Sequence, residues 1–205
     1  MTSQRVEELL ADNGATYAHE AGIRLEDKPS PLYQLLVLST LLSTRISAHI
    51  AVAAAREVFE AGWRTPRAIA DASRDDLVEA LGRAHYRRYD ESTSTALGEG
   101  AHLLIERWHG DLRRLREEAD GDPQRIRRLL QEFPRIGPVG ADIFCREAQG
   151  LWKELRPSFD KRARDGAEKY GLPKDPKKLA ALVPSDELPQ LAAALVRSTL
   201  QESRT

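Results

Sequence analysis

The sequence predicts an all-α protein, and three observations carry this prediction. Alanine, leucine, arginine and glutamate, which favour helices, are the commonest residues. Runs of alternating Val, Ile and Thr between turns, which would indicate strands, do not occur. Signals typical of helix starts recur instead, at Thr65-Pro66, Ser73 with Asp76, Asp122-Pro123, Asp175-Pro176 and Ser185.

Apolar periodicity and these start signals divide the chain into about ten helices. The expected helices cover residues 3–13, 30–43, 46–61, 66–71, 74–82, 91–108, 123–132, 138–150 and 159–170, and a C-terminal group covers 176–202. The stretch from Leu35 to Leu42 is apolar on nearly every side, so we expect it to lie buried at the centre. Residues 111–128 are strongly charged and are expected at the surface.

Composition excludes several classes of protein. Apolar residues make up 41% of the 205 residues, enough for a core, and charged residues make up 31%, which argues against a membrane protein. The N-terminal residues lack the apolar region of a secretory signal, so a cytoplasmic protein is expected. The single cysteine, Cys145, leaves no intramolecular disulfide and no all-cysteine iron–sulfur or zinc site. Cys145 itself is expected to be a small buried residue of a helix.

Charge alone does not predict a nucleic-acid partner. The chain has 31 basic and 32 acidic residues and a net charge of -1. A DNA-binding chain with this balance must gather basic residues on one face. Arginines do cluster, at residues 87–88, 113–116, 125–128 and 161–164. For most of these clusters a solvated helix surface is the simpler interpretation.

The segment Leu129–Ile143, with the sequence LLQEFPRIGPVGADI, is the most informative in the chain. It predicts a helix ending near Phe133, a tight turn, and a new helix beginning at Pro138. The N–H groups at such a helix start bind phosphate well. Gly137 permits a positive φ, and Gly140 and Ala141 permit close approach to the backbone or to a partner helix. Alone, the pattern fits an ordinary helical corner equally well.

This segment resembles the helix-hairpin-helix motif of the endonuclease III and adenine glycosylase superfamily, whose hairpin reads Leu-Pro-Gly-Val-Gly. Phe133–Gly137 follows that pattern, with Arg135 in place of the first glycine. The resemblance runs from about Pro31 to Ser198. It implies two helical lobes, one of residues 30–137 that includes the hairpin and one of residues 1–29 with 138–205.

In that family the hairpin binds DNA phosphates, often with a monovalent cation held by loop carbonyls. By resemblance, Arg135, Gly137, Val139 and Gly140 are expected to contact DNA. Arg135 either replaces part of the cation's role with its own charge or perturbs the loop.

The family also has an aspartate at the start of a helix downstream of the hairpin, and Asp160 matches it. A fixed carboxylate stabilises the positive charge that develops on deoxyribose when the N-glycosidic bond breaks, and it can help to activate water. The resemblance therefore implies that Asp160 is catalytic, with Lys161 beside it as a DNA contact. The plainer alternative is an aspartate that only caps a helix.

Two departures from the family narrow the expected activity. Members with lyase activity carry a lysine just inside the helix after the hairpin, and Val139 occupies that position. We therefore expect a glycosylase without lyase chemistry, although Lys153 or Lys161 could in principle substitute. Many relatives end in a four-cysteine iron–sulfur cluster, which this chain lacks the cysteines to form.

Two further segments resemble the family's base-recognition loops. Arg45 stands where relatives have a glutamine that fills the gap left by a flipped nucleotide, and a surface arginine is the equal alternative. In the loop from Gly82 to Tyr89, His85 and Tyr86 are candidates for the base pocket or for a wedge, as is Tyr89. Arg87 and Arg88 of the same loop suit phosphate contacts.

Together these features predict a monofunctional DNA glycosylase of base-excision repair. Its expected partner is double-stranded DNA with a damaged or mismatched base, and it is expected to be a monomeric cytoplasmic protein associated with the nucleoid. No cofactor and no iron–sulfur cluster are expected, and a monovalent cation at the hairpin is left open. A non-catalytic helix-hairpin-helix DNA-binding protein is the first alternative, and a helical protein–protein adaptor is the second.

Overall fold

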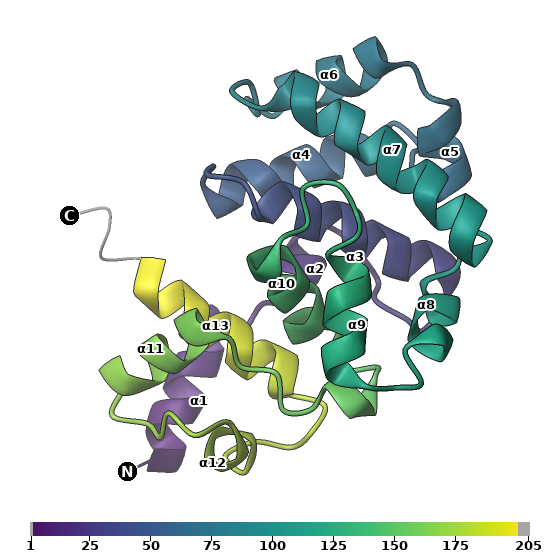
Figure 1. The fold of residues 1–205 in the computed structure, drawn as a ribbon. Helices are drawn as coiled ribbons and strands as arrows, with labels where there is room; N and C mark the ends of the chain where they lie inside the picture. The colour runs from purple at the N-terminus through teal and green to yellow at the C-terminus, as the bar shows by residue number, and fades with distance from the viewer. Residues whose placement is uncertain (1, 201–205) are drawn as a thin grey trace. The chain divides into compact units, whose positions relative to one another are not determined.

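The computed structural model describes residues 2–200, which form helices and, within that range, no strand (Figure 1). The all-α prediction is therefore confirmed. One 3-10 turn, η1 (Lys153–Leu155), accompanies the α-helices. The helices are α1 (Thr2–Asn13), α2 (Tyr17–Glu20), α3 (Pro29–Leu42), α4 (Ala48–Glu60), α5 (Pro66–Asp71), α6 (Arg74–Arg83), α7 (Asp90–Trp108), α8 (Leu112–Glu118), α9 (Pro123–Leu130), α10 (Pro138–Ala148), α11 (Lys161–Lys169), α12 (Pro176–Ala180) and α13 (Leu188–Leu200).

The chain divides into two compact units. The central unit runs from Ala18 to Phe144, and the terminal unit combines the residues up to Tyr17 with those from Cys145 onward. These boundaries lie after residues 17 and 144, whereas the family resemblance implies boundaries after residues 29 and 137. The second boundary lies later because α10 is one continuous helix, whose first residues belong with the hairpin and whose last residues belong with the terminal unit.

Helix α3 is the centre of the central unit, as its apolar sequence predicts. Every residue from Leu32 to Leu41 is buried, and α3 packs against α4, α7 and α8. Two hydroxyls in this helix are buried but keep a hydrogen bond. Ser39 donates to the carbonyl of Leu35 at 2.8 Å, and Thr40 donates to that of Leu36 at 2.9 Å.

Four predicted helix starts are confirmed by their hydrogen bonds. The side chain at each of these positions accepts from a backbone N–H of the first turn, at 2.8 to 3.2 Å, and so satisfies an otherwise unpaired donor. The capping residues are Thr65, Ser73, Asp122 and Asp175.

The charged segment 111–128 contains a helix that the sequence analysis did not predict. Helix α8 buries Leu112 and Leu115, and charged residues between them hide this apolar spacing. Glu118 at its end accepts from the Trp108 indole at 2.7 Å and pairs with Arg107 at 2.7 Å. Arg107 also pairs with Glu132 and lies over the Trp108 ring, so α8 is joined to the residues just before the hairpin.

In the terminal unit, α13 packs against both α1 and α11 (Figure 1). Its buried face is rich in alanine and leucine, which allows close helix packing. Cys145 is buried in α10, as predicted. Across the described residues, no helix combines the length and the apolar character needed to cross a membrane.

Candidate nucleic-acid interface and carboxylate site

The hairpin between α9 and α10 is anchored by one aromatic side chain. Phe133 is 3% exposed, and its ring stacks on that of Trp108 with 5.5 Å between centroids. The N–H of Ile136 donates to the carbonyl of Phe133 at 3.1 Å, which closes the turn. The buried packing of Phe133 on Trp108 therefore supports the exposed residues at the tip of the hairpin.

Gly137 permits a positive φ, but the backbone of the tip takes a positive φ at another residue. The residue with positive φ is Arg135, at 64°, and Gly137 is not in the left-handed region. Arg135 stands at the position of the first glycine in the hairpin pattern that this segment resembles, and here a residue with a side chain takes a conformation that glycine adopts most easily. That side chain is held in place, because its Nη1 donates to Ser92 Oγ at 3.0 Å and its guanidinium lies 5.5 Å from the centre of the Tyr89 ring.

The residues at the start of α10 differ in exposure. Gly137, Pro138 and Val139 are exposed, and Val139 is the one large apolar side chain of the described residues that stands out, at 56% exposure. The N–H of Val139 lies in the first turn, where an α-helix offers no partner, so it is free to meet a ligand. Gly140 is instead buried, and a Cβ there would lie 3.2 Å from Cγ2 of Ile136 and 3.3 Å from Cβ of Ser43, so this glycine packs against the hairpin and the residue after α3.

Three loops of the central unit are tied together at this point. Ser43 Oγ donates to the carbonyl of Arg135 at 3.1 Å, which joins the loop after α3 to the hairpin. Thr44 Oγ1 and the Tyr86 hydroxyl are 2.7 Å apart, which joins the same loop to the one before α7. Arg135 closes the set through Ser92 of α7. The structure thus brings together the three segments that the sequence analysis assigned to DNA.

Tyr86 does not occupy the surface position expected of a base-stacking residue. It is fully buried, and its hydroxyl is engaged with Thr44 and with the carbonyl of Leu41. Burial raises the pKa of Tyr86, so the hydroxyl stays protonated and able to donate. Tyr86 supports the loop from inside, while the partly exposed Tyr89 is the aromatic side chain nearer the hairpin.

The other candidates of the central unit are exposed. Arg45, His85, Arg87 and Arg88 all present their side chains to solvent, and His85 has a positive φ of 61°. Within residues 2–200, Arg45, Arg87 and Arg88 form no ion pair. Their charges are therefore available to phosphates on loops that the hydrogen bonds above hold together.

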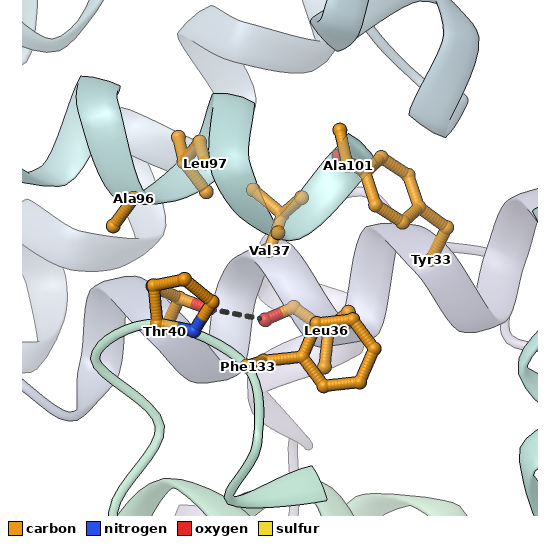
Figure 2. A pocket seen from close by; sticks show the side chains of 10 residues that line it. Tyr33, Leu36, Val37, Thr40, Ala96, Leu97, Ala101 and Phe133 are labelled. Atoms are coloured by element: carbon orange, nitrogen blue, oxygen red, sulfur yellow. Dashed lines mark hydrogen bonds between the residues drawn. The ribbon is translucent and has the colours of Figure 1, made fainter. Parts of the chain in front are cut away.

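A small cavity behind the hairpin is not a base pocket. Its volume is about 10 Å³, room for a single water at most. Figure 2 shows Phe133 of the hairpin on one side, Ala96, Leu97 and Ala101 of α7 on the other, and Val37 and Tyr33 of α3 between them. The Thr40 hydroxyl beside it is already bonded to Leu36. The cavity marks where the hairpin packs on its supporting helices.

In the terminal unit, Asp160 is the N-cap of α11, and both of its oxygens are engaged. Oδ1 accepts from the N–H of Ala163 at 2.9 Å, and Oδ2 accepts from Nη1 of Arg146 at 2.6 Å. The Asp160 side chain is 11% exposed and that of Arg146 is 3% exposed. The site is thus a largely buried, charge-assisted pair in which a small part of the Asp160 side chain is accessible.

The loop before Asp160 is fixed by Gln149. Its side-chain amide donates to the carbonyl of Ser158 at 3.0 Å and accepts from the N–H of the same residue at 2.9 Å. Arg156 closes the other end of the loop through the carbonyls of Gln149 and Gly150. Lys161, the neighbour of Asp160, is exposed and pairs with Asp165 at 2.7 Å, a surface contact that a phosphate could replace at small cost.

Arg146 and Gln149 are functional candidates that the sequence analysis missed. Arg146 lies in the last turn of α10 and Gln149 directly follows that helix, and they hold Asp160 and Ser158, which lie two residues apart. The signal was present, because two charged residues and one amide residue are buried in the stretch from Ile143 to Gln149. Periodicity could not show which residue would meet them.

The described residues contain no cluster of three or more His, Cys, Asp or Glu side chains able to hold a metal ion. A four-cysteine cluster does not fit the chain, since Cys145 is its one cysteine.

Comparison with known proteins shows the fold. No protein family and no curated protein sequence matches the chain. Two solved structures are similar to it at 16% identity: a trapped covalent endonuclease III–DNA intermediate described as an estranged-adenine complex, and a non-covalent endonuclease III–DNA complex. Each comparison covers 96% of this chain and 85% of the other, with TM-scores of 0.51 and 0.52. The chain therefore has an all-helical, endonuclease III-like fold.

Proposed function

We propose that this protein is a monofunctional DNA glycosylase of base-excision repair. The observation that carries the proposal is the Asp160 carboxylate, which caps a helix downstream of an exposed helix-hairpin-helix tip. The two similar structures are of endonuclease III bound to DNA, which supports a DNA partner. Double-stranded DNA with a damaged or mismatched base is the proposed substrate, which would place a monomeric protein with the chromosome.

The proposed mechanism divides the work between the two units. The hairpin tip and the arginines of the adjoining loops bind phosphates and position the duplex. Cleavage of the N-glycosidic bond leaves positive charge on the sugar, which the accessible part of Asp160 stabilises while water adds to the sugar. The products are a free base and an abasic site. Val139 supplies no amine, so no covalent enzyme–sugar adduct forms through it.

A panel of duplexes tests the proposed activity. The duplexes carry uracil, hypoxanthine, an alkylated base or an oxidised base, each opposite several partners. We expect base release from at least one duplex, strand breaks only after alkali or heat, and no adduct on borohydride reduction. Asp160→Asn, which keeps the cap, should lower the release rate about 100-fold or more. It should be measured well below its own unfolding temperature, because it removes the partner of Arg146. Unchanged release by Asp160→Asn would contradict the assignment.

Gly137→Ala tests the phosphate contact at the hairpin tip. Gly137 has ordinary φ and a Cβ there would meet nothing within 4 Å, so the variant should keep the stability of the wild type. If a phosphate approaches this backbone, the added methyl group should weaken DNA binding about tenfold, measured by fluorescence anisotropy at fixed salt. Gly98→Ala of α7, which is equally open, is the matched control. Equal affinities for both variants would place the DNA elsewhere.

The positive charge of Arg135 argues against the need for a monovalent cation at this hairpin. The Arg135 side chain places its guanidinium near the hairpin through Ser92 and Tyr89 and supplies positive charge of its own. We therefore propose that DNA binding does not depend on which monovalent cation is present. Equal affinities in sodium and potassium at matched ionic strength are the expected result.

One observation favours a second candidate, a non-catalytic DNA-binding protein. The guanidinium of Arg146 lies 2.6 Å from Asp160 and offsets the negative charge that a positively charged sugar would need. On this alternative Asp160 only caps α11. It predicts salt-dependent DNA binding without base release from any duplex of the panel.

A further inference from the structure

The burial of Asp160 exceeds what capping a helix requires. Asp122 and Asp175 cap α9 and α12 with the same type of hydrogen bond, at 2.8 and 2.9 Å, and both are exposed. Asp160 is instead 11% exposed and faces an arginine that is 3% exposed. Burying an ion pair costs desolvation of both charges, so a buried pair is a poor means of gaining stability alone. A purely structural role therefore leaves Arg146 unexplained.

We propose that Arg146 is the positioning residue of Asp160, which it holds in one orientation for reaction with a deoxyribose. This inference rests on the proposed glycosylase function and adds a residue to it. A carboxylate held through one oxygen can turn about its last bond, but the N–H of Ala163 and Nη1 of Arg146 hold separate oxygens. Each oxygen keeps a second lone pair, so the accessible part of the side chain remains free to face substrate.

The surroundings of Arg146 direct it toward Asp160. Its guanidinium lies over the Tyr17 ring, 5.7 Å from the centroid, and Nε is buried without a hydrogen-bond partner. Among the described residues, Asp160 is the acceptor that the Arg146 side chain meets. The backbone N–H of Tyr17 in turn donates to Glu147, the next residue of α10, at 3.3 Å. The N-terminal segment thus stacks against the arginine that holds the carboxylate.

Gln149 completes the arrangement by fixing the backbone before Asp160. Its amide bonds both the N–H and the carbonyl of Ser158, two residues from Asp160. Arg146, in the last turn of α10, therefore places the side chain of Asp160, and Gln149, which follows the helix, places its backbone. Fixing Asp160 through both residues should matter for the reaction rate, since a misplacement of about 1 Å at a reacting group can lower the rate 100-fold.

A double-mutant cycle tests the interaction between Arg146 and Asp160 without reference to activity. Arg146→Met, Asp160→Asn and the double variant are unfolded with urea in the full chain. Each single variant leaves one buried member without its charged partner, whereas the double variant removes both charges and keeps the cap. We expect the double variant to be more stable than the two single effects predict, by about tenfold or more in the unfolding equilibrium constant. Additive effects would overturn the proposal.

The kinetics of base release separate positioning from mere stability. At a temperature where every variant is folded, Arg146→Met should lower kcat about 100-fold with little change in KM. Arg146→Lys should recover part of that loss, because an ammonium still meets the carboxylate, though without a fixed planar geometry. Coupling in the cycle with an unchanged kcat in Arg146→Met would overturn the positioning role. If the wild type releases no base, the proposed function fails, and the cycle still decides whether Arg146 holds Asp160.

Discussion

Gly166→Ala should destabilise the terminal unit by about 3 kcal/mol or more. Gly166 lies in α11 where this helix packs on α13. A Cβ at this position would overlap the carbonyl oxygen of Leu195 and lie 2.8 Å from Ser198 Oγ. Because the obstacle is the backbone of a buried helix, no rotation of a side chain relieves it, and α11 must move away from α13. Such a loss is a large share of a typical domain's stability.

The measurement is urea unfolding followed by circular dichroism, with a glycine in open space as the control. Gly98→Ala in α7 adds the same methyl group where nothing lies within 4 Å, and it should stabilise the protein by about 0.5–1 kcal/mol through helix propensity. The opposite signs distinguish crowding from the general effect of replacing glycine in a helix. A wild-type midpoint for Gly166→Ala would mean that α11 and α13 are not in this close contact. Because Asp160 caps α11, displacement of this helix should also lower the rate of base release.

Helix starts were the most predictable part of this fold, because they depend on neighbours in sequence. Four predicted capping residues cap their helices as expected: Thr65, Ser73, Asp122 and Asp175. The apolar run of α3 is buried as predicted. Asp160 belongs to this group, since its place before a helix could be read from the chain. Its partner could not, because Arg146 lies fourteen residues away across a loop.

Long-range packing decided the features that sequence could not show. Tyr86 was a candidate for the base pocket or a wedge, yet its ring is buried and its hydroxyl reaches Thr44, forty-two residues away. Gly137 permits a positive φ, but Arg135 is the residue that takes it, supported by its contacts with Ser43 and Ser92. In both cases the deciding partner lies in a distant segment of the central unit.

Phe133→Ala should cost about 3–5 kcal/mol and also weaken DNA binding. The ring is nearly fully buried, stacks on Trp108 and lies against α7 at Gly100, where a Cβ would come within 3.6 Å of it. It also lines the existing cavity of about 10 Å³, so its removal enlarges a space that the surrounding helices already leave unfilled (Figure 2). The adjoining Pro134 then loses its support, and the hairpin tip becomes mobile.

The two effects of Phe133→Ala are separable because Phe133→Leu keeps most of the volume. Leucine should cost less than about 1.5 kcal/mol if the site repacks, and it should leave DNA affinity close to that of the wild type. Thermal unfolding and fluorescence anisotropy, the latter at a temperature where both variants are folded, provide the comparison. Wild-type affinity in folded Phe133→Ala would mean that the tip needs no anchor to bind phosphate. Weakened binding in alanine alone would show that the buried volume of the side chain at position 133 fixes the hairpin's backbone donors, because no residue of the tip itself has been changed.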